Sequence, residues 1–243
     1  MRRHSFGQHS FGQHYLINPE VIQLMISTAK LDGCEAVLEI GTGKGILTEK
    51  LVGLCSRLDG YEVDPENYRE TLARLGERSA FIHLADVFNE RPRFDVLVSS
   101  LPYSRSLDFI EWISQANYDR AVVLLQEDFV RKVLSPPGSR NYRAVSAIAQ
   151  ISSEIRVIQR VGRSAFRPPP KVNSALVVIE PKVKLSKWQV LGIKRLFSLR
   201  RKEVASALAL LGLTGGQRNS ERRRVYSLTP AEVYEILAGQ ESA

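Results

Sequence analysis

The sequence predicts an α/β fold in which a largely parallel β-sheet is covered by helices and followed by a small helical domain. Three observations support this prediction. Short β-rich runs alternate with helical stretches over residues 36–180, and parallel strands need such crossover helices. A glycine-rich turn directly follows the first run. After Pro181 the apolar residues recur only at helical spacing.

The elements follow from local composition. A polar lead-in of about 20 residues contains a duplication, Ser5–His9 and Ser10–His14, and Pro19 then precedes an apolar-faced helix that includes Val21–Ile26. Runs rich in Val, Ile and Leu predict strands, and longer stretches with wider apolar spacing predict helices. The expected order is strand Ala36–Ile40, helix Gly45–Cys55, strand Leu58–Val63, helix Pro65–Leu75 capped by Asp64, strand Ala80–Leu84, strand Phe94–Ser99, helix Leu107–Ala116 and strand Arg120–Leu125.

The last β-rich runs are Ser153–Gln159 and Ser174–Ile179, separated by the proline-rich Phe166–Lys171. Little room remains for a crossover helix, so we expect an antiparallel hairpin or an addition at a sheet edge. Beyond Pro181 the pattern predicts one long helix over Lys187–Ala209 and a final helix with Thr229 as its N-cap and Pro230 at its first position. We therefore expect two domains, residues 1–181 and 182–243.

Charge and cysteine content narrow the class of protein. The formal net charge is +8, and the segment after Pro181 holds twelve lysines and arginines against five acidic residues. A basic end piece suits a polyanion such as nucleic acid, although a solvated helical surface explains it equally well. No apolar run reaches the roughly 20 residues of a membrane span, and no secretory signal is evident. Cys34 and Cys55 lack metal-ligand spacing, so we expect a cytoplasmic protein without a metal site. We also expect a monomer.

The glycine-rich turn is Gly41-Thr42-Gly43-Lys44-Gly45, and it matches neither the dinucleotide fingerprint nor the phosphate-binding P-loop. It allows a ligand to approach the backbone, although many such turns are only tight connections. Glu39, two residues before Gly41, favours a methyltransferase.

Two acidic residues follow the next strands. Glu62 stands where a carboxylate can accept hydrogen bonds from both hydroxyls of a ribose. By itself it would more often be a surface carboxylate, but the preceding glycine turn at the right distance favours the nucleoside. Asp86 could accept the amino group of a cofactor adenine while the Val87 amide donates to the ring, and a simple turn cap is an equal alternative.

The turn Ser99-Ser100-Leu101-Pro102-Tyr103 is the most informative about the substrate. It resembles the Asn/Asp/Ser-x-Pro-Tyr/Phe signature of methyltransferases that act on exocyclic amino groups of bases. The lone pair of adenine N6 is delocalised into the ring. Acceptors from Ser100 and the Leu101 carbonyl would orient both N–H groups and aim that lone pair at a sulfonium methyl group. Tyr103 can stack on a base turned out of its helix or loop.

At this point the chain resembles the ribosomal RNA adenine dimethyltransferase family of the KsgA type, which is related to the Erm methyltransferases. Gly12–Leu16 resembles the N-terminal box of the family, a lid over the cofactor within residues 1–20, and the duplicate Gly7–His9 lacks its aromatic-Leu ending. Leu125–Lys132 resembles the segment after strand five, and Phe166–Ala175 closely resembles the proline-rich box that borders the target-base pocket.

The resemblance implies a Rossmann-like class I methyltransferase fold, S-adenosyl-L-methionine as cofactor, and rRNA or a small ribosomal subunit precursor as partner. It implies cofactor contacts at Gln13, His14, Leu16, Gly41, Thr42, Gly43, Glu62, Val63, Asp86, Val87 and Ser100. It implies catalysis at Ser100, Leu101, Pro102, Tyr103 and Phe166. Phosphate contacts are expected from the basic clusters of Arg200, Arg201 and Lys202 and of Arg222, Arg223 and Arg224.

Ser100 departs from the asparagine usual in the family. Serine is shorter and its hydroxyl can be oriented either way, so slower transfer or a product with one methyl group is expected. The sequence therefore predicts mono- or dimethylation of adenine N6 in small-subunit, 16S-type rRNA. Two alternatives stay open: an rRNA-binding assembly factor with weak or no catalysis, and an adenine methyltransferase for 23S rRNA or tRNA.

Overall fold

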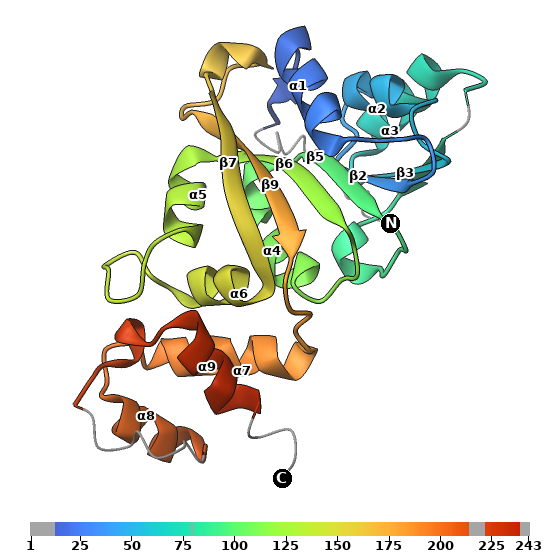
Figure 1. Ribbon diagram of the computed structural model, residues 1–243. Coiled ribbons are helices and arrows are strands. Elements are labelled where there is room, and N and C mark those ends of the chain that lie inside the picture. The colour runs from blue at the N-terminus through green and yellow to red at the C-terminus, as the bar shows by residue number, and fades with distance from the viewer. Residues whose placement is uncertain (1–12, 79, 214–221, 239–243) are drawn as a thin grey trace, which may run out of the picture.

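A seven-stranded sheet forms the centre of the computed structural model, which describes residues 13–78, 80–213 and 222–238 (Figure 1). Its strands are β2 (Ala36–Ile40), β3 (Arg57–Glu62), β4 (Phe81–Leu84), β5 (Val96–Ser100), β6 (Arg120–Gln126), β7 (Ser153–Val161) and β9 (Ser174–Pro181). Their order in space is β4-β3-β2-β5-β6-β9-β7. The pairs from β4 to β6 are parallel, whereas β9 is antiparallel to both of its neighbours. The predicted α/β fold is thus confirmed.

Helices cover both faces of the sheet (Figure 1), which explains why the central strands are apolar on both sides. The first face carries α1 (Pro19–Ala29), α2 (Ile46–Leu51) and α3 (Pro65–Leu75), and the second carries α4 (Ser106–Ile113), α5 (Glu127–Val133) and α6 (Ala144–Ser152). The predicted bounds of α3 and its cap are confirmed, since the Asp64 carboxylate accepts from the Glu66 amide at 2.8 Å.

The C-terminal part consists of α7 (Lys187–Ser198), α8 (Val204–Leu211), the short η4 turn (Val225–Ser227) and α9 (Pro230–Ala238). Thr229 caps α9 as predicted: its hydroxyl accepts from the Glu232 amide at 3.2 Å, and the Glu232 carboxylate accepts from the Thr229 amide at 2.8 Å. Buried residues of α7 and α9, such as Ile193 and Val233, join the same apolar core as Ile148 of α6. The helical part therefore packs on the sheet region through a continuous core.

The single long helix expected over Lys187–Ala209 is wrong. The chain turns between α7 and α8, where the carbonyls of Arg200 and Lys202 accept the amides of Tyr226 and Val225. These tertiary hydrogen bonds replace the helical ones, while apolar residues continue at helical spacing on either side. The pattern alone therefore could not reveal the break.

The other differences concern the sheet region. The antiparallel pairing of the two last runs is confirmed, but β9 is inserted between β6 and β7, so Ser174–Pro181 is an interior strand and β7 is the edge. Helices α2 and α4 end four and three residues before the predicted Cys55 and Ala116. Helices α5 and α6 were not predicted as helices. The duplicated lead-in before Gln13 lies outside the described residues.

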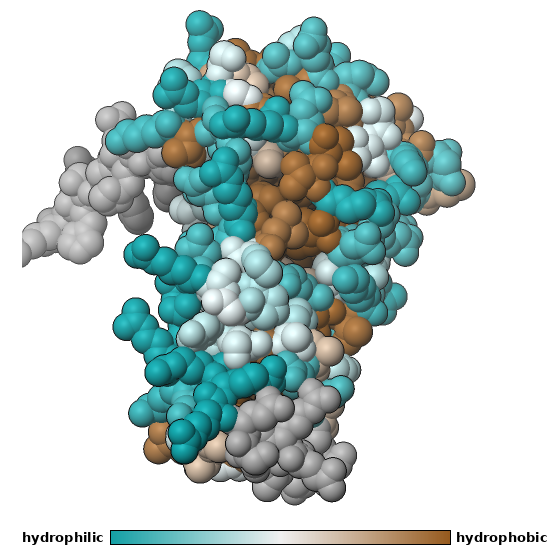
Figure 2. Space-filling model, turned by 60° about the vertical axis from the view of Figure 1, so that its left-hand side comes forward, coloured by the Kyte–Doolittle hydropathy of each residue, from teal (hydrophilic) through white to brown (hydrophobic). Residues whose placement is uncertain are grey.

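A second, two-stranded ribbon pairs β1 (Tyr15–Leu16) with β8 (Phe166–Arg167). On another face, the surface between α5 and β7 is hollowed and apolar (Figure 2), and Val130, Leu134 and Val157 are among the residues that line it. Within the described residues, no helix combines the length and the apolar character that a membrane span requires.

Candidate functional site

The main candidate site is a cavity of about 470 Å³ at the carboxyl ends of β2, β3 and β5. In open α/β sheets, ligands bind at this edge, and the volume lies in the range of small-molecule sites. The cavity is lined by Gln13, His14, Tyr15, Gly41, Gly43, Glu62, Val63, Asn67, Ser100, Leu101, Pro102, Tyr103, Ser104, Arg105 and Phe166. All five residues predicted for catalysis and seven of the eleven predicted for the cofactor, with Ser100 in both sets, line this one cavity.

Glu62 holds the glycine turn at one end of the cavity. Its carboxylate accepts from the amides of Gly43 and Val63 at 2.8 Å and of Asp64 at 2.9 Å. Burial raises the pKa of Glu62, and these three amides oppose that shift. Three of the roughly four acceptor positions of a carboxylate are thus used by the backbone. An acceptor position on Oε2 therefore remains for a ribose hydroxyl, and the contact with both ribose hydroxyls stays a prediction.

The turn itself leaves no room for larger residues. Gly43 has a φ of 55°, and a Cβ there would lie 3.2 Å from the ring of Tyr15. Gly41 has a φ of 74°, and its Cβ would lie 3.2 Å from Pro102. Glycine is required at both positions for its backbone conformation and for this close approach.

Glu39 lies beneath the turn on β2 and is only 1% exposed. Burial, reinforced by the charge of Glu62, raises the pKa of Glu39 to about 8. The side chain is therefore mostly protonated at neutral pH. Glu39 does not line the cavity, and the side chain nearest its carboxyl group is Thr48 of α2.

Ser100 and Tyr103 occupy the other end of the cavity. Ser100 is the last residue of β5, and Tyr103 begins the short η2 turn (Tyr103–Arg105). The Tyr103 hydroxyl lies 2.5 Å from the hydroxyl of Ser174, which is fully buried at the start of β9. Burial raises the pKa of Tyr103. The ring of Tyr103 is thus fixed at its far end by an interior strand.

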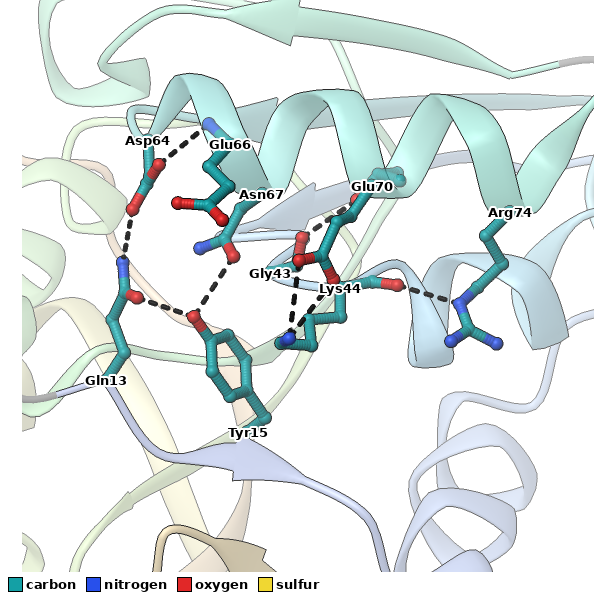
Figure 3. A network of polar contacts seen from close by, with 10 residues as sticks. Gln13, Tyr15, Gly43, Lys44, Asp64, Glu66, Asn67, Glu70 and Arg74 are labelled. Carbon is teal, nitrogen blue, oxygen red and sulfur yellow. Dashed lines mark hydrogen bonds and ion pairs between the residues drawn. The ribbon is translucent and has the colours of Figure 1, made fainter.

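An N-terminal strap, residues 13–18, crosses this edge of the sheet and is fastened to α3 (Figure 3). Gln13 Nε2 donates to the Asp64 carboxylate at 3.0 Å. The Tyr15 hydroxyl lies 2.5 Å from Gln13 Oε1 and 3.0 Å from Asn67 Oδ1, and these two acceptors share its one proton. The ammonium group of Lys44 lies 5.2 Å from the centre of the Tyr15 ring. These contacts hold the strap beside the glycine turn.

The same strap is joined to the proline-rich box. Leu16 pairs with Phe166 in the β1–β8 ribbon. His14 Nδ1 lies 2.8 Å from the Pro168 carbonyl, which requires a proton on Nδ1, and its ring centre lies 5.9 Å from that of Tyr103. The strap therefore connects the glycine end of the cavity with the end that Phe166 and Tyr103 line.

Four residues predicted to contact the cofactor do not line the cavity. Leu16 and Val87 are buried in the core, and the Thr42 hydroxyl lies 3.2 Å from that of Thr71. The Asp86 carboxylate accepts from the Phe88 amide and from Arg105 Nη2, both at 3.0 Å. Asp86 thus acts as the turn cap that the sequence left as an alternative. Asp86 is therefore one hydrogen bond away from the cavity, because Arg105 lines the cavity.

The sequence reasoning did not assign Tyr15, Asn67, Ser104, Arg105 or Ser174 to the site. Tyr15 and Ser174 lie within the segments that resemble the family's N-terminal and proline-rich boxes, and Ser104 and Arg105 directly follow the Pro-Tyr turn. A position within or next to a motif could therefore have indicated these four residues. Asn67 lies within an ordinary helical pattern, and no signal in the sequence marks it.

The six basic residues expected to contact phosphate lie at the α7–α8 turn and before η4. Arg201, Lys202, Arg222 and Arg224 are exposed. Arg223 forms an ion pair with Glu232 at 2.7 Å. Its guanidinium group is therefore engaged within the fold. Among the described residues, His, Cys, Asp and Glu side chains form no group of three that could hold a metal ion.

Comparison with known proteins relates the whole chain to one family. A family described as ribosomal RNA adenine dimethylase matches residues 5–237. A probable ribosomal RNA small subunit methyltransferase A of Thermococcus onnurineus is 33% identical over 241 residues, covering 92% of this chain and 89% of the relative. A probable dimethyladenosine transferase of Dictyostelium discoideum is 33% identical and covers 84% and 69% of the two chains.

Solved structures agree on the fold. A dimethyladenosine transferase from Plasmodium falciparum superposes with a TM-score of 0.78 at 24% identity, covering 94% of this chain and 98% of the other. The 23S rRNA methyltransferase ErmE gives a TM-score of 0.64 at 21% identity, covering 92% and 99%. The Rossmann-like class I methyltransferase fold is thus confirmed.

Proposed function

The chain belongs to the ribosomal RNA adenine dimethylase family, and on that premise we propose that it methylates N6 of adenine in small-subunit rRNA with S-adenosyl-L-methionine as methyl donor. The observation that carries this proposal is a single cavity lined by the glycine turn, Glu62 and the Ser100–Tyr103 turn. A nucleoside-type donor and an exocyclic amine would therefore meet in one space.

The glycine end of the cavity fits the cofactor. Gly43 leaves the backbone open where a Cβ would close it, and the Glu62 carboxylate keeps one acceptor position for a ribose hydroxyl. Val63, exposed beside Glu62 at the end of β3, offers an apolar surface to the adenine ring. When bound, S-adenosyl-L-methionine supplies an electrophilic methyl group on a positively charged sulfur.

The Ser100 end of the cavity orients the exocyclic amino group of the target adenine. The Ser100 hydroxyl and the Leu101 carbonyl accept the two N–H groups of N6, so that the lone pair leaves the plane of the ring. The ring of Tyr103, held by Ser174, and that of Phe166 hold the base between them. With S-adenosyl-L-methionine bound, the N6–C bond would form as the C–S bond of the cofactor breaks, and N6 would lose one proton to solvent. Orientation and acceptor placement carry the rate, without prior deprotonation of the amine.

The test is transfer of labelled methyl groups to immature small ribosomal subunits, followed by nucleoside analysis, with 23S rRNA and tRNA as parallel substrates. We expect label in N6-methylated adenosine of the small subunit. Tyr103→Ala should abolish transfer while retaining affinity for S-adenosylhomocysteine. Absence of label in adenosine, with cofactor binding intact, would refute the proposed reaction.

Ser100 supports a second candidate, an rRNA-binding assembly factor with weak catalysis. Its hydroxyl has no hydrogen-bond partner in the described part of the chain, and it reaches less far than an asparagine amide. Ser100→Asn separates the two candidates. A modest change from an already active enzyme supports the methyltransferase, whereas a large gain from a barely active protein supports the assembly factor.

A further inference from the structure

A charged junction lies between the sheet region and the helical C-terminal part, away from the cavity. The loop of residues 134–143, which connects α5 and α6, packs on the turn between α7 and α8 and on η4 (Figure 1). The Gly138 amide donates to the Tyr226 carbonyl at 2.8 Å, and Arg200 Nη2 donates to the Arg140 carbonyl at 3.1 Å. These bonds fix the loop and the turn relative to each other.

The junction gathers arginines from both segments. Arg140, Arg143 and Arg201 are exposed, whereas the Nε of Arg200 is buried without a hydrogen-bond partner. Burial lowers the pKa of Arg200, and the nearby charges of Arg143 and Arg201 lower it further. In the described part of the chain, none of these four guanidinium groups is paired with a carboxylate. The fold thus holds like charges together without a counter-ion.

The start of α6 adds positive potential at the same place. Arg143 is the N-cap residue of this nine-residue helix, its amide donates to the Ser146 hydroxyl at 3.1 Å, and the first turn contains no acidic residue. The N-terminus of a helix carries a partial positive charge that acidic side chains usually offset. The helix end and the arginines therefore favour the same kind of ligand, an anion. In Figure 2, which brings this side of the molecule forward, residues of intermediate hydropathy lie directly below the apolar hollow, and strongly hydrophilic residues gather beneath and to the left of them.

We propose that Arg140 and Arg143, together with the N-terminus of α6, extend the phosphate contacts already expected of Arg200 and Arg201 and bind the phosphodiester backbone of the RNA substrate. The proposal rests on the proposed function and adds catalytic-region residues to the grip of the C-terminal part. Phosphate oxygens suit guanidinium groups because they accept paired N–H donors. Bound phosphates also relieve the repulsion among the four cations.

This site would also set the register of the RNA. The loop follows α5, which begins directly after β6, and the Glu127 amide of α5 donates to the carbonyl of Asn173, next to Ser174. A phosphate held at the junction is therefore connected through short, packed elements to the residue that fixes Tyr103. Phosphate contacts position a nucleic acid, while base contacts select it.

The test compares Arg140→Gln/Arg143→Gln with a matched control, Lys50→Gln/Arg91→Gln, which removes two exposed charges elsewhere. The affinity of each full-length variant for a naked small-subunit rRNA transcript is measured over a range of salt concentrations. Each lost phosphate contact should lower the slope of log affinity against log salt by roughly 0.7–0.9. We expect a loss of slope of about one to two for the junction variant and a smaller loss for the control.

Arg140→Lys/Arg143→Lys should restore the slope because it restores the charges. Thermal unfolding and S-adenosylhomocysteine binding serve as controls for folding. If Arg143→Gln disturbs α6, Arg140→Gln/Arg201→Gln tests the same site without the cap residue.

Equal slopes for the junction variant and the control would overturn the proposal. So would a defect seen on assembled particles and absent on naked rRNA, since the partner would then be a protein. If the unsubstituted protein binds rRNA with the expected slope but transfers no methyl group, the proposed reaction fails and the phosphate site stands.

Discussion

The two ends of the cavity are organised by different means. At the Glu62 end, three backbone amides hold one carboxylate, and the glycine turn is shaped by its own φ angles. The Ser100 end is defined by side chains: the Tyr103 hydroxyl is hydrogen-bonded to that of Ser174, and the Ser100 hydroxyl has no hydrogen-bond partner in the described part of the chain.

This difference indicates whether each end of the cavity has its binding geometry before the ligand arrives or acquires it only when the ligand binds. A backbone-built end has little freedom to lose when a ligand binds, so it is preorganised for a cofactor that is the same in every turnover. An end built from side chains keeps at least one free acceptor and is completed by the base. Changes at the first end should therefore alter stability and cofactor affinity, and changes at the second end should alter turnover.

The largest expected effect concerns Glu39, beneath the backbone-built end. Its pKa of about 8 lies above the ordinary value of 4.5. Glu39 therefore stabilises the fold at low pH, and this contribution is lost as the pH rises from about 4.5 through about 8, at up to roughly 1.4 kcal/mol per pH unit. Glu39→Gln should flatten this part of the curve of unfolding free energy against pH, measured by urea titration.

Glu20→Gln, at an exposed glutamate on α1, provides the control for the loss of one carboxylate. Parallel curves for the unsubstituted protein and Glu39→Gln would show that Glu39 is ionised in the folded state at neutral pH.

The next effect is on cofactor affinity. Glu62→Gln replaces a carboxylate that accepts three amides by a neutral group in which one position is a donor. Hydrogen bonds to charged groups contribute about 1.5–3 kcal/mol, so the dissociation constant of S-adenosylhomocysteine should rise by roughly 10- to 100-fold. Titration calorimetry measures it, with Glu66→Gln on the exposed side of α3 as control. A change of less than about threefold would contradict the backbone-built end described above.

Sequence reasoning was most successful where function depends on position along one strand or turn. Glu62, Ser100 and Tyr103 follow strand ends, and the carboxyl ends of parallel strands necessarily share one edge. The Pro65 helix and the Thr229 cap were predicted because capping is local chemistry. The contact of Glu62 with both ribose hydroxyls stays a prediction, and the sequence could not show that three backbone amides donate to the same carboxylate.

The missed features depend on contacts between distant segments. The bond between Tyr103 and Ser174 joins residues 71 positions apart, and that between Tyr15 and Asn67 joins residues 52 apart. The break between α7 and α8 depends on η4, which follows about twenty residues later. For Asp86 the sequence offered adenine binding or a turn cap equally; the local cap to the Phe88 amide is present, whereas the ion pair with Arg105 is a contact that no local pattern encodes.

A moderate effect is expected where side chains build the target end. Tyr103→Phe and Ser174→Ala each remove the 2.5 Å hydrogen bond, which is worth about 1 kcal/mol. We expect roughly a fivefold loss in kcat, with unchanged affinity for S-adenosylhomocysteine. If Ser174 acts only through the Tyr103 hydroxyl, the double variant should be no slower than either single variant. Additive losses in kcat would show that Ser174 has a separate role.

The smallest effect concerns the strap, where side chains close the backbone-built end. Tyr15→Phe removes the hydroxyl that Gln13 Oε1 and Asn67 Oδ1 share and leaves the ring beside Lys44 and Gly43. The strap should then open more easily by about 0.5 kcal/mol, and S-adenosylhomocysteine should dissociate roughly twice as fast. Stopped-flow displacement measures this rate, and Tyr68→Phe on α3 is the control. If Tyr15→Phe and Tyr68→Phe release the ligand at the same rate, the strap does not retain the cofactor, and preorganisation of that end rests on Glu62 and the glycine turn alone.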